Sequence, residues 1–282
     1  MFLVILWLLL IVFSPSPAHG QWVVEPGAGW VDMTLFHQDT EERFDHRGER
    51  EDIFADGRTV STSLFLTASV GVVRGVDAWA EVPVHRLRFQ DVAGDRKSSG
   101  PGDVRLFVRA GPEAVGLPAI PVTLRVGSKL PVGDFDVDAE IIPLGEGQTD
   151  WEVMVEAGLA DSDGNLHTSG WFGRRFRLEN EETLRDPGDE WFWFWQTAGP
   201  GGPIPLTWNV GAEGTHGGAW VIEGVRVPSA RRRLVEVFGS VSYSMGPGHL
   251  KAGARIPVSG RNMPAGTIWS LGYFLSWTRP GT

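Results

Sequence analysis

Residues 269–277 read Trp-Ser-Leu-Gly-Tyr-Phe-Leu-Ser-Trp, and this stretch decides the fold. Every second side chain from Trp269 to Trp277 is aromatic or leucine. Because successive side chains of a β-strand point to opposite faces, the stretch predicts a strand with one continuous apolar face. Aromatic residues at both ends of that face, with leucines between them, are typical of a strand that faces lipid and meets both membrane surfaces. An ordinary strand of a soluble β-sandwich is the alternative.

Alternation of apolar and polar residues recurs upstream, whereas a helical period is hard to find after residue 20. In residues 103–110, for example, Leu106 and Val108 share one face, and Arg105 and Arg109 share the other. We expect twelve antiparallel strands on this basis. They fall at residues 27–38, 58–72, 75–90, 102–112, 119–130, 149–160, 165–178, 203–213, 218–227, 231–245, 248–258 and 266–278.

The connections between these strands alternate between short and long. The tight turns fall at residues 74–75, 161–164 and 246–248. The long polar connections fall at residues 39–58, 91–100, 133–148 and 179–190. An even number of strands, with short turns at one end and long loops at the other, is the arrangement of bacterial outer-membrane barrels. The sequence therefore predicts an all-β fold, a closed antiparallel transmembrane β-barrel of about twelve strands.

The eighth and ninth strands, at residues 203–213 and 218–227, have the weakest alternation. The aromatic stretch 191–195, from Trp191 to Trp195, lies just before them. Two interpretations stay open: this stretch begins the eighth strand, or it forms a separate aromatic segment at the outer interface.

The first twenty residues differ from the rest of the chain. Residues 2–13 are almost entirely apolar, and the small-x-small pattern Ala18-His19-Gly20 follows. The apolar run has the length of a signal-peptide core and is short for a membrane-spanning helix. We expect a signal peptide at residues 1–20, cleaved after Gly20, and a single outer-membrane barrel domain at residues 21–282. A single uncleaved anchor helix is the alternative.

Composition excludes several classes of protein. The chain has no cysteine, which excludes a disulfide scaffold and a thiolate nucleophile. The formal net charge of −10 argues against nucleic acid as a partner, since binding phosphates requires a basic surface. The 13 tryptophans suit a membrane interface or a sugar-binding surface.

The last predicted strand also resembles a known assembly signal. Its spacing is Ser270-x-Gly272-x-x-Leu275-x-Trp277, which is similar to the terminal-strand signal of outer-membrane proteins. The usual signal stops at its final aromatic residue, whereas residues 278–282 follow Trp277 here. The resemblance implies that the barrel-assembly machinery and outer-membrane lipids are partners of the chain.

Two further motifs resemble a transporter family. Residues 100–104 read Gly-Pro-Gly-Asp-Val, residues 128–134 read Ser-Lys-Leu-Pro-Val-Gly-Asp, and residues 82–84 read Val-Pro-Val. These are similar to segments of the outer-membrane family named for the meta-cleavage pathway of phenol degradation, over residues 27–278. The resemblance implies a barrel that passes hydrophobic or aromatic compounds, and it implies no catalytic residue.

The polar faces of the predicted strands carry charges that alternate in sign from strand to strand. If the valine and leucine faces meet lipid, these charged faces line the lumen and can form cross-strand ion pairs. The expected lumen residues are Asp77, Glu81, His85, Asp103, Arg105, Arg109, Arg125, Lys129, Glu152, Glu156, Lys251 and Arg255. Two interpretations stay open: a charge-lined conduit, or a packing network that fills a narrow interior.

Metal and catalytic motifs are weak. Asp134, Asp136 and Asp138 resemble the start of a calcium loop, but Ala139 and Gly145 stand where glycine and glutamate are required. No G-x-S-x-G motif occurs, and the histidines have no recognisable spacing with serine. We therefore expect no metal, no cofactor and no enzymatic activity.

The sequence therefore predicts an outer-membrane channel or transporter for small molecules, hydrophobic or aromatic ones included. The alternatives are a non-conducting barrel that binds a ligand at its surface or serves a structural role, and a barrel-embedded enzyme.

Overall fold

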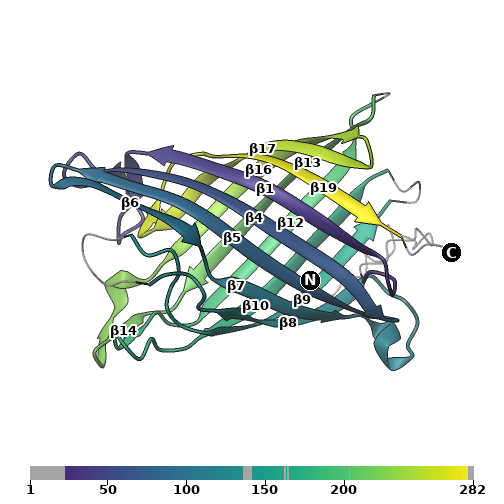
Figure 1. The fold of residues 1–282 in the computed structure, drawn as a ribbon, viewed down its shortest axis with the longest axis horizontal. Helices are drawn as coiled ribbons and strands as arrows, with labels where there is room; N and C mark the ends of the chain where they lie inside the picture. The colour runs from purple at the N-terminus through teal and green to yellow at the C-terminus, as the bar shows by residue number, and fades with distance from the viewer. Residues whose placement is uncertain (1–22, 136–141, 162, 164, 203, 279–282) are drawn as a thin grey trace, which may run out of the picture.

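The computed structural model describes residues 23–135, 142–161, 163, 165–202 and 204–278. Within these residues, twelve antiparallel strands close into one barrel (Figure 1). β19 pairs with β1 from Gly29↔Trp277 to Gln38↔Ile268, and this pairing closes the ring. In the order of the chain and of the wall, the strands are β1 (Gly29–Thr40), β4 (Arg58–Val73), β5 (Val76–Asp91), β7 (Val104–Ala110), β8 (Val122–Leu130), β9 (Asp150–Ala160), β10 (His167–Arg177), β12 (Glu190–Pro200), β13 (Leu206–Gly217), β16 (Arg233–Met245), β17 (Gly248–Arg261) and β19 (Ile268–Trp277).

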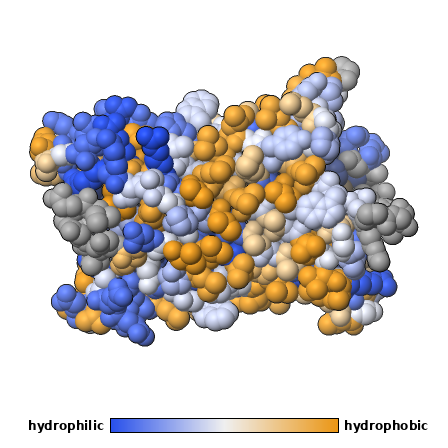
Figure 2. All heavy atoms as spheres, viewed as in Figure 1, coloured by the Kyte–Doolittle hydropathy of each residue, from blue (hydrophilic) through white to orange (hydrophobic). Residues whose placement is uncertain are grey.

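The outer surface of the barrel is apolar because the outward positions of the strands carry many valines and leucines and several of the tryptophans. In β7, Leu106 is 45% exposed and Val108 is 54% exposed on the outer face. Arg109, which faces the interior, is 5% exposed. Figure 2 shows apolar side chains covering the middle of the barrel, and polar side chains gathered at the end where β6 and β14 lie. This apolar belt is the surface that a transmembrane barrel presents to lipid.

In this barrel, polar residues are buried and apolar residues are exposed, which is the reverse of a soluble protein. Among the described residues, eighteen polar or charged residues are buried, against seven hydrophobic ones. The small hydrophobic cluster in the interior consists of Phe107, Met154 and Phe192, packed against Trp79 and Trp171. The polar side chains therefore form the inside of the barrel, and their pairing must offset the cost of removing them from water.

The two ends of the barrel differ. Short connections, such as residues 74–75 and 246–247, join strands at one end, which we call the turn end. The long connections lie at the other end, the loop end, and contain short elements of their own (Figure 1). The loop-end strands are β2 (Glu42–Phe44), β3 (Arg50–Asp52), β6 (Gly94–Pro101), β11 (Arg185–Asp186), β14 (Trp220–Ile222), β15 (Val225–Val227) and β18 (Met263–Pro264). The 3-10 helices are η1 (Pro112–Val115), at the turn end, and η2 (Pro228–Ala230), at the loop end.

The predicted strand at residues 218–227 was wrong as a barrel strand, whereas the predicted strand at residues 203–213 corresponds to β13. The eighth barrel strand is β12, which contains the whole aromatic stretch 191–195, and the ninth is β13. Residues 220–227 instead form the short hairpin of β14 and β15, which pairs with β11 outside the wall. β12 was missed because Phe192 and Phe194 face inward, so that residues 191–195 are aromatic on both faces and do not alternate with polar residues.

The long connection at residues 91–100 was also predicted incorrectly, because most of it forms β6. This strand pairs with the loop-end half of β5, from Val84↔Pro101 to Asp91↔Gly94. The alternation rule did not find β6 because its residues are polar and largely exposed, so neither of its faces is apolar. The predicted signal peptide, residues 1–20, lies outside the described residues. No helix in the described part of the chain has the length and apolar character needed to cross a membrane.

The apolar belt yields a stability prediction. Leu106→Arg places a charge on the outer face of β7, and we expect it to lower the free energy of unfolding by about 2–4 kcal/mol if this face meets hydrocarbon. Urea titration of the barrel in lipid vesicles, followed by tryptophan fluorescence, measures the change. The matched control is Val225→Arg, which adds the same charge to an exposed position in the β14–β15 hairpin. Equal effects of the two substitutions would contradict a lipid-facing β7.

Candidate functional site in the barrel interior

The inward faces of β5, β7, β8, β9, β10 and β12 carry two neighbouring sets of ion pairs, which together we call the charge network. It consists of Asp77, Glu81, Asp103, Arg105, Arg109, Arg125, Lys129, Glu146, Asp150, Glu152, Glu156, Arg175, Arg177 and Glu190. All of these residues except Glu146 lie on barrel strands or directly before one. The network runs from the turn end to the loop end along one side of the interior.

At the turn end, Arg109 joins two carboxylates. Its Nη2 lies 2.6 Å from Asp77 Oδ2, and its Nη1 lies 3.2 Å from Glu156 Oε2. Arg125 Nε lies 2.8 Å from the other oxygen of Glu156. The guanidinium of Arg125 also lies over the ring of Trp79, 4.5 Å from its centroid, which adds a cation–π contact.

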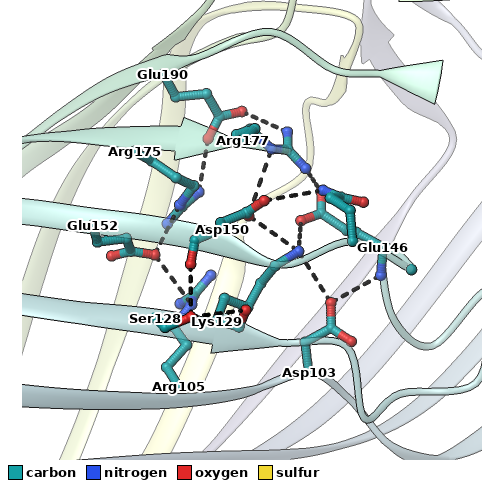
Figure 3. A network of polar contacts seen from close by, with 12 residues as sticks. Asp103, Arg105, Ser128, Lys129, Glu146, Asp150, Glu152, Arg175, Arg177 and Glu190 are labelled. Carbon is teal, nitrogen blue, oxygen red and sulfur yellow. Dashed lines mark hydrogen bonds and ion pairs between the residues drawn. The ribbon is translucent and has the colours of Figure 1, made fainter. Parts of the chain in front are cut away.

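In the middle of the network, two arginines share Glu152. Arg105 Nη1 lies 3.0 Å from Glu81 Oε1, and its Nε lies 3.6 Å from Glu152 Oε1. Arg175 Nε lies 2.8 Å from the same Glu152 oxygen, and Arg175 Nη1 lies 2.7 Å from Glu190 Oε2. Figure 3 shows the side chains of Arg105, Glu152, Arg175 and Glu190 converging from neighbouring strands.

At the loop end, Lys129 is the centre of the network, and only 2% of its side chain is exposed. Its Nζ lies 3.1 Å from Asp103, 2.7 Å from Glu146 and 3.1 Å from Asp150 (Figure 3). Glu146 comes from the β8–β9 loop and also binds Arg177, at 2.6 Å. Burial alone would raise the pKa of Glu146, but Arg177 and Lys129 hold that pKa well below its ordinary value of 4.5.

The two family-like motifs of the sequence meet at this loop end. Asp103, from the glycine-x-glycine-aspartate segment, accepts a hydrogen bond from the backbone nitrogen of Gly133 at 3.2 Å and from that of Glu146 at 2.9 Å. Gly133 is required because a side chain there would lie 2.9 Å from Gly145 and 3.0 Å from Gly102. The motifs therefore hold the β8–β9 loop against the end of β7, where Lys129 completes the contact.

Sequence reasoning missed five members of the network: Glu146, Asp150, Arg175, Arg177 and Glu190. A signal was available for three of them, because Asp150 shares a face with Glu152 and Glu156, and Arg175 and Arg177 share a face of a predicted strand. Glu190 begins the strand that was missed, and Glu146 lies in a loop whose position the strand pattern does not determine.

The opposite side of the interior has fewer charges. Lys251 pairs with Asp32, and Arg255 pairs with Glu213. His85 Nδ1 lies 2.8 Å from the Oγ of Ser63, a residue that lines the interior. Asp32, Ser63 and Glu213 were not among the predicted site residues, although they share faces with polar neighbours.

Between the two sides lies open space. A cavity of about 960 Å³ extends along β1, β4, β13, β16, β17 and β19, and a second of about 380 Å³ adjoins it beside the network. The two share lining residues, among them Trp79, Trp171 and Phe194, so they form one interior space. We call this space the interior cavity. Its walls combine ion pairs, hydroxyl groups and aromatic rings.

The residues of the expected assembly signal fall on both faces of β19. Ser270 and Gly272 line the interior cavity, whereas Trp277 is exposed on the outer face, where Leu275 also points. Gly272 pairs with Thr34 of β1, whose side chain would lie 2.4 Å from a Cβ at this position. A small residue is therefore needed where the last strand joins the first.

No group of three potential metal-ligating side chains is found in the described part of the chain. Asp136 and Asp138 of the calcium-like run lie outside that part. Asp134 is described, and its backbone oxygen accepts hydrogen bonds from Leu144 and Gly145.

The charge network yields a second stability prediction. Lys129→Met leaves Asp103 buried without a cation and leaves Asp150 with Arg177 alone, 3.6 Å away, and we expect a loss of about 3–5 kcal/mol in the free energy of unfolding. Lys97→Met, at an exposed lysine 2.7 Å from Asp95, is the matched control and is expected to cost less than about 1 kcal/mol. Urea titration in vesicles compares both with the unchanged chain. Equal losses for the two variants would show that the buried ion pairs of Lys129 contribute no more to the free energy of unfolding than an exposed ion pair does.

No protein-family model matches the sequence, and the search of curated proteins finds no match. Among solved structures, the chain is similar to an outer membrane channel from Pseudomonas putida F1, with 15% sequence identity and a TM-score of 0.74 over 94% of this chain and 100% of that one. It is also similar to the β domain of the Bordetella autotransporter BrkA, with 10% identity and a TM-score of 0.56 over 89% of this chain and 100% of that one. At these identities the likeness is one of fold alone, and it agrees with the closed transmembrane barrel described above.

Proposed function

We propose that the chain is an outer-membrane channel that passes small molecules through the barrel. The observation that carries this proposal is the interior cavity, whose larger part has a volume of about 960 Å³ and is lined from β1 to β19. A space of this size accepts a small solute and excludes a folded polypeptide. The polar and charged walls favour a water-filled path, because charges facing a lumen need water or partners.

The aromatic rings in the cavity wall support a solute with a flat apolar part. Trp30, Phe36, Phe65, Trp171 and Phe238 all line the cavity. Membership of the family named for the meta-cleavage pathway of phenol degradation is part of this proposal. It is supported by the contacts among Asp103, Lys129 and Gly133, which join the two motifs that carry the resemblance.

Location in the outer membrane also belongs to the proposal. The apolar outer belt and the even-numbered ring of strands support it. We propose that Ser270, Gly272, Leu275 and Trp277 are read by the barrel-assembly machinery before β19 pairs with β1. Outer-membrane lipids then contact the exposed tryptophans and leucines.

A non-conducting barrel is the second candidate, and the charge network favours it. Paired, buried charges occupy much of the side of the interior between β5 and β12, where the cavity is about 380 Å³ against about 960 Å³ on the other side. Binding of a ligand at the surface by residues 191–195 has less support. Trp191, Trp193 and Trp195 lie on the outer face of a barrel strand, which belongs to the apolar belt. An enzyme also has less support. The interior His85 is hydrogen-bonded to Ser63, and among the described residues no carboxylate forms a hydrogen bond with it that would orient the ring for catalysis.

Conductance separates the two candidates. We expect the purified, folded barrel to carry current in a planar lipid bilayer. Lys251→Gln, in the cavity wall, should shift the reversal potential in a salt gradient toward cation selectivity because it leaves Asp32 unpaired. Lys97→Gln, which removes an exposed lysine from β6, is the control and should leave selectivity unchanged. A folded barrel that stays electrically silent would contradict the channel and favour the packing network.

A further inference from the structure

Two carboxylates lie side by side in the wall of the interior cavity. Glu213 of β13 and Glu236 of β16 are direct cross-strand partners, and both line the cavity. Arg255 pairs with Glu213. Glu236 is only 6% exposed, yet its Oε1 has no hydrogen-bond partner, and no cation pairs with it among the described residues. The carboxyl group of Glu236 is therefore without a partner of opposite charge in this corner of the described structure.

Glu236 differs in this respect from the other charged residues of the cavity wall. Each of the others has an ion-pair partner of opposite sign: Asp32, Glu81, Arg105, Arg125, Glu152, Arg175, Glu213, Lys251 and Arg255. A buried carboxylate without a partner is costly, because it has lost its contact with water and gained no hydrogen bond or cation. A ligand that supplied a positive charge here would remove that cost.

Aromatic rings form a platform beside this carboxylate. Trp171, Phe194 and Glu213 follow one another across β10, β12 and β13, and Glu236 continues the row. The rings of Trp171 and Phe194 stack with centroids 3.9 Å apart, and Phe194 stacks on Phe238 at 5.2 Å. The guanidinium groups of Arg125 and Arg255 lie over the outer rings of this row, 5.5 Å from the centroid of Trp171 and 5.4 Å from that of Phe238. The row therefore offers a solute an apolar surface, and the contact for a positive charge must come from Glu236.

We propose that the interior cavity binds an organic cation that has a flat apolar body, such as an arylalkylammonium ion. Glu236 is the counter-ion for the ammonium group, and the Trp171–Phe194–Phe238 platform receives the apolar body. This inference rests on the proposed channel function in one respect, since it names the class of solute. Binding itself requires only the cavity and no passage through the membrane.

Isothermal titration of the folded full-length barrel in detergent tests the site with three probes of one shape. Phenethylammonium carries the positive charge, 2-phenylethanol is neutral, and 3-phenylpropionate is negative. We expect phenethylammonium to bind at least about tenfold more tightly than 2-phenylethanol, since a charge-assisted contact is worth more than one factor of ten in affinity. We expect 3-phenylpropionate to bind more weakly still.

Substitution at the carboxylate gives the second arm. Glu236→Gln should reduce the affinity for phenethylammonium by about tenfold and leave that for 2-phenylethanol unchanged. Glu236→Asp, which retains the charge, should keep the preference for the cation. Glu223→Gln, in the exposed β14–β15 turn, removes the same charge outside the cavity and should bind as the unchanged chain does. Heat-dependent migration on a denaturing gel shows that each variant is folded.

Two results would overturn the site: equal binding of the ammonium ion and the alcohol, or unchanged binding of the ammonium ion by Glu236→Gln. These outcomes are distinct from failure of the channel. A barrel that binds phenethylammonium through Glu236 but carries no current contradicts the channel and leaves the site intact. A conducting barrel without preference for the cation contradicts the site alone.

Discussion

Pairing between β1 and β19 is the constraint on which the rest of the structure depends. In hydrocarbon, a backbone N–H or C=O group without a partner is costly, so a sheet can cross a membrane only when its first and last strands meet. The register from Gly29↔Trp277 to Gln38↔Ile268 achieves this closure. Closure then determines the direction of each side chain, because alternate residues of a strand point to lipid and to the interior. The charges that face the interior must find partners there, and the charge network is the result.

The interior is asymmetric, and this asymmetry connects the fold with the proposed function. On the side from β5 to β12, Lys129, Arg109 and Arg175 each bind two or more carboxylates, and the smaller part of the cavity, about 380 Å³, lies beside them. On the other side, where Glu236 lies, the charges are fewer and the cavity is open. A rigid, paired wall facing an open, aromatic wall is an arrangement that suits selective passage of small solutes.

Alternation was sufficient to predict the closed barrel and most of its strands, because an apolar face and a polar face differ sharply in β5, β7, β8 and β9. The same rule indicated Arg105 and Arg109 as inward residues from the outward position of Leu106. It failed at β12, where Phe192 and Phe194 take the inward positions that polar residues hold elsewhere. The ion pairs of Glu146 could not be predicted from the pattern, because they depend on how the β8–β9 loop folds over the closed ring.

The central claim is that alternate residues of the wall face lipid and interior. The chain has no cysteine, so single cysteines can be introduced at each position of β7 and labelled with a nitroxide. Electron paramagnetic resonance then measures collision with oxygen, which is enriched in lipid, and with a water-soluble nickel complex. The structure predicts high oxygen accessibility at positions 104, 106, 108 and 110, and low oxygen accessibility at positions 105, 107 and 109. Accessibility that does not alternate, or that alternates in the opposite phase, would contradict the account.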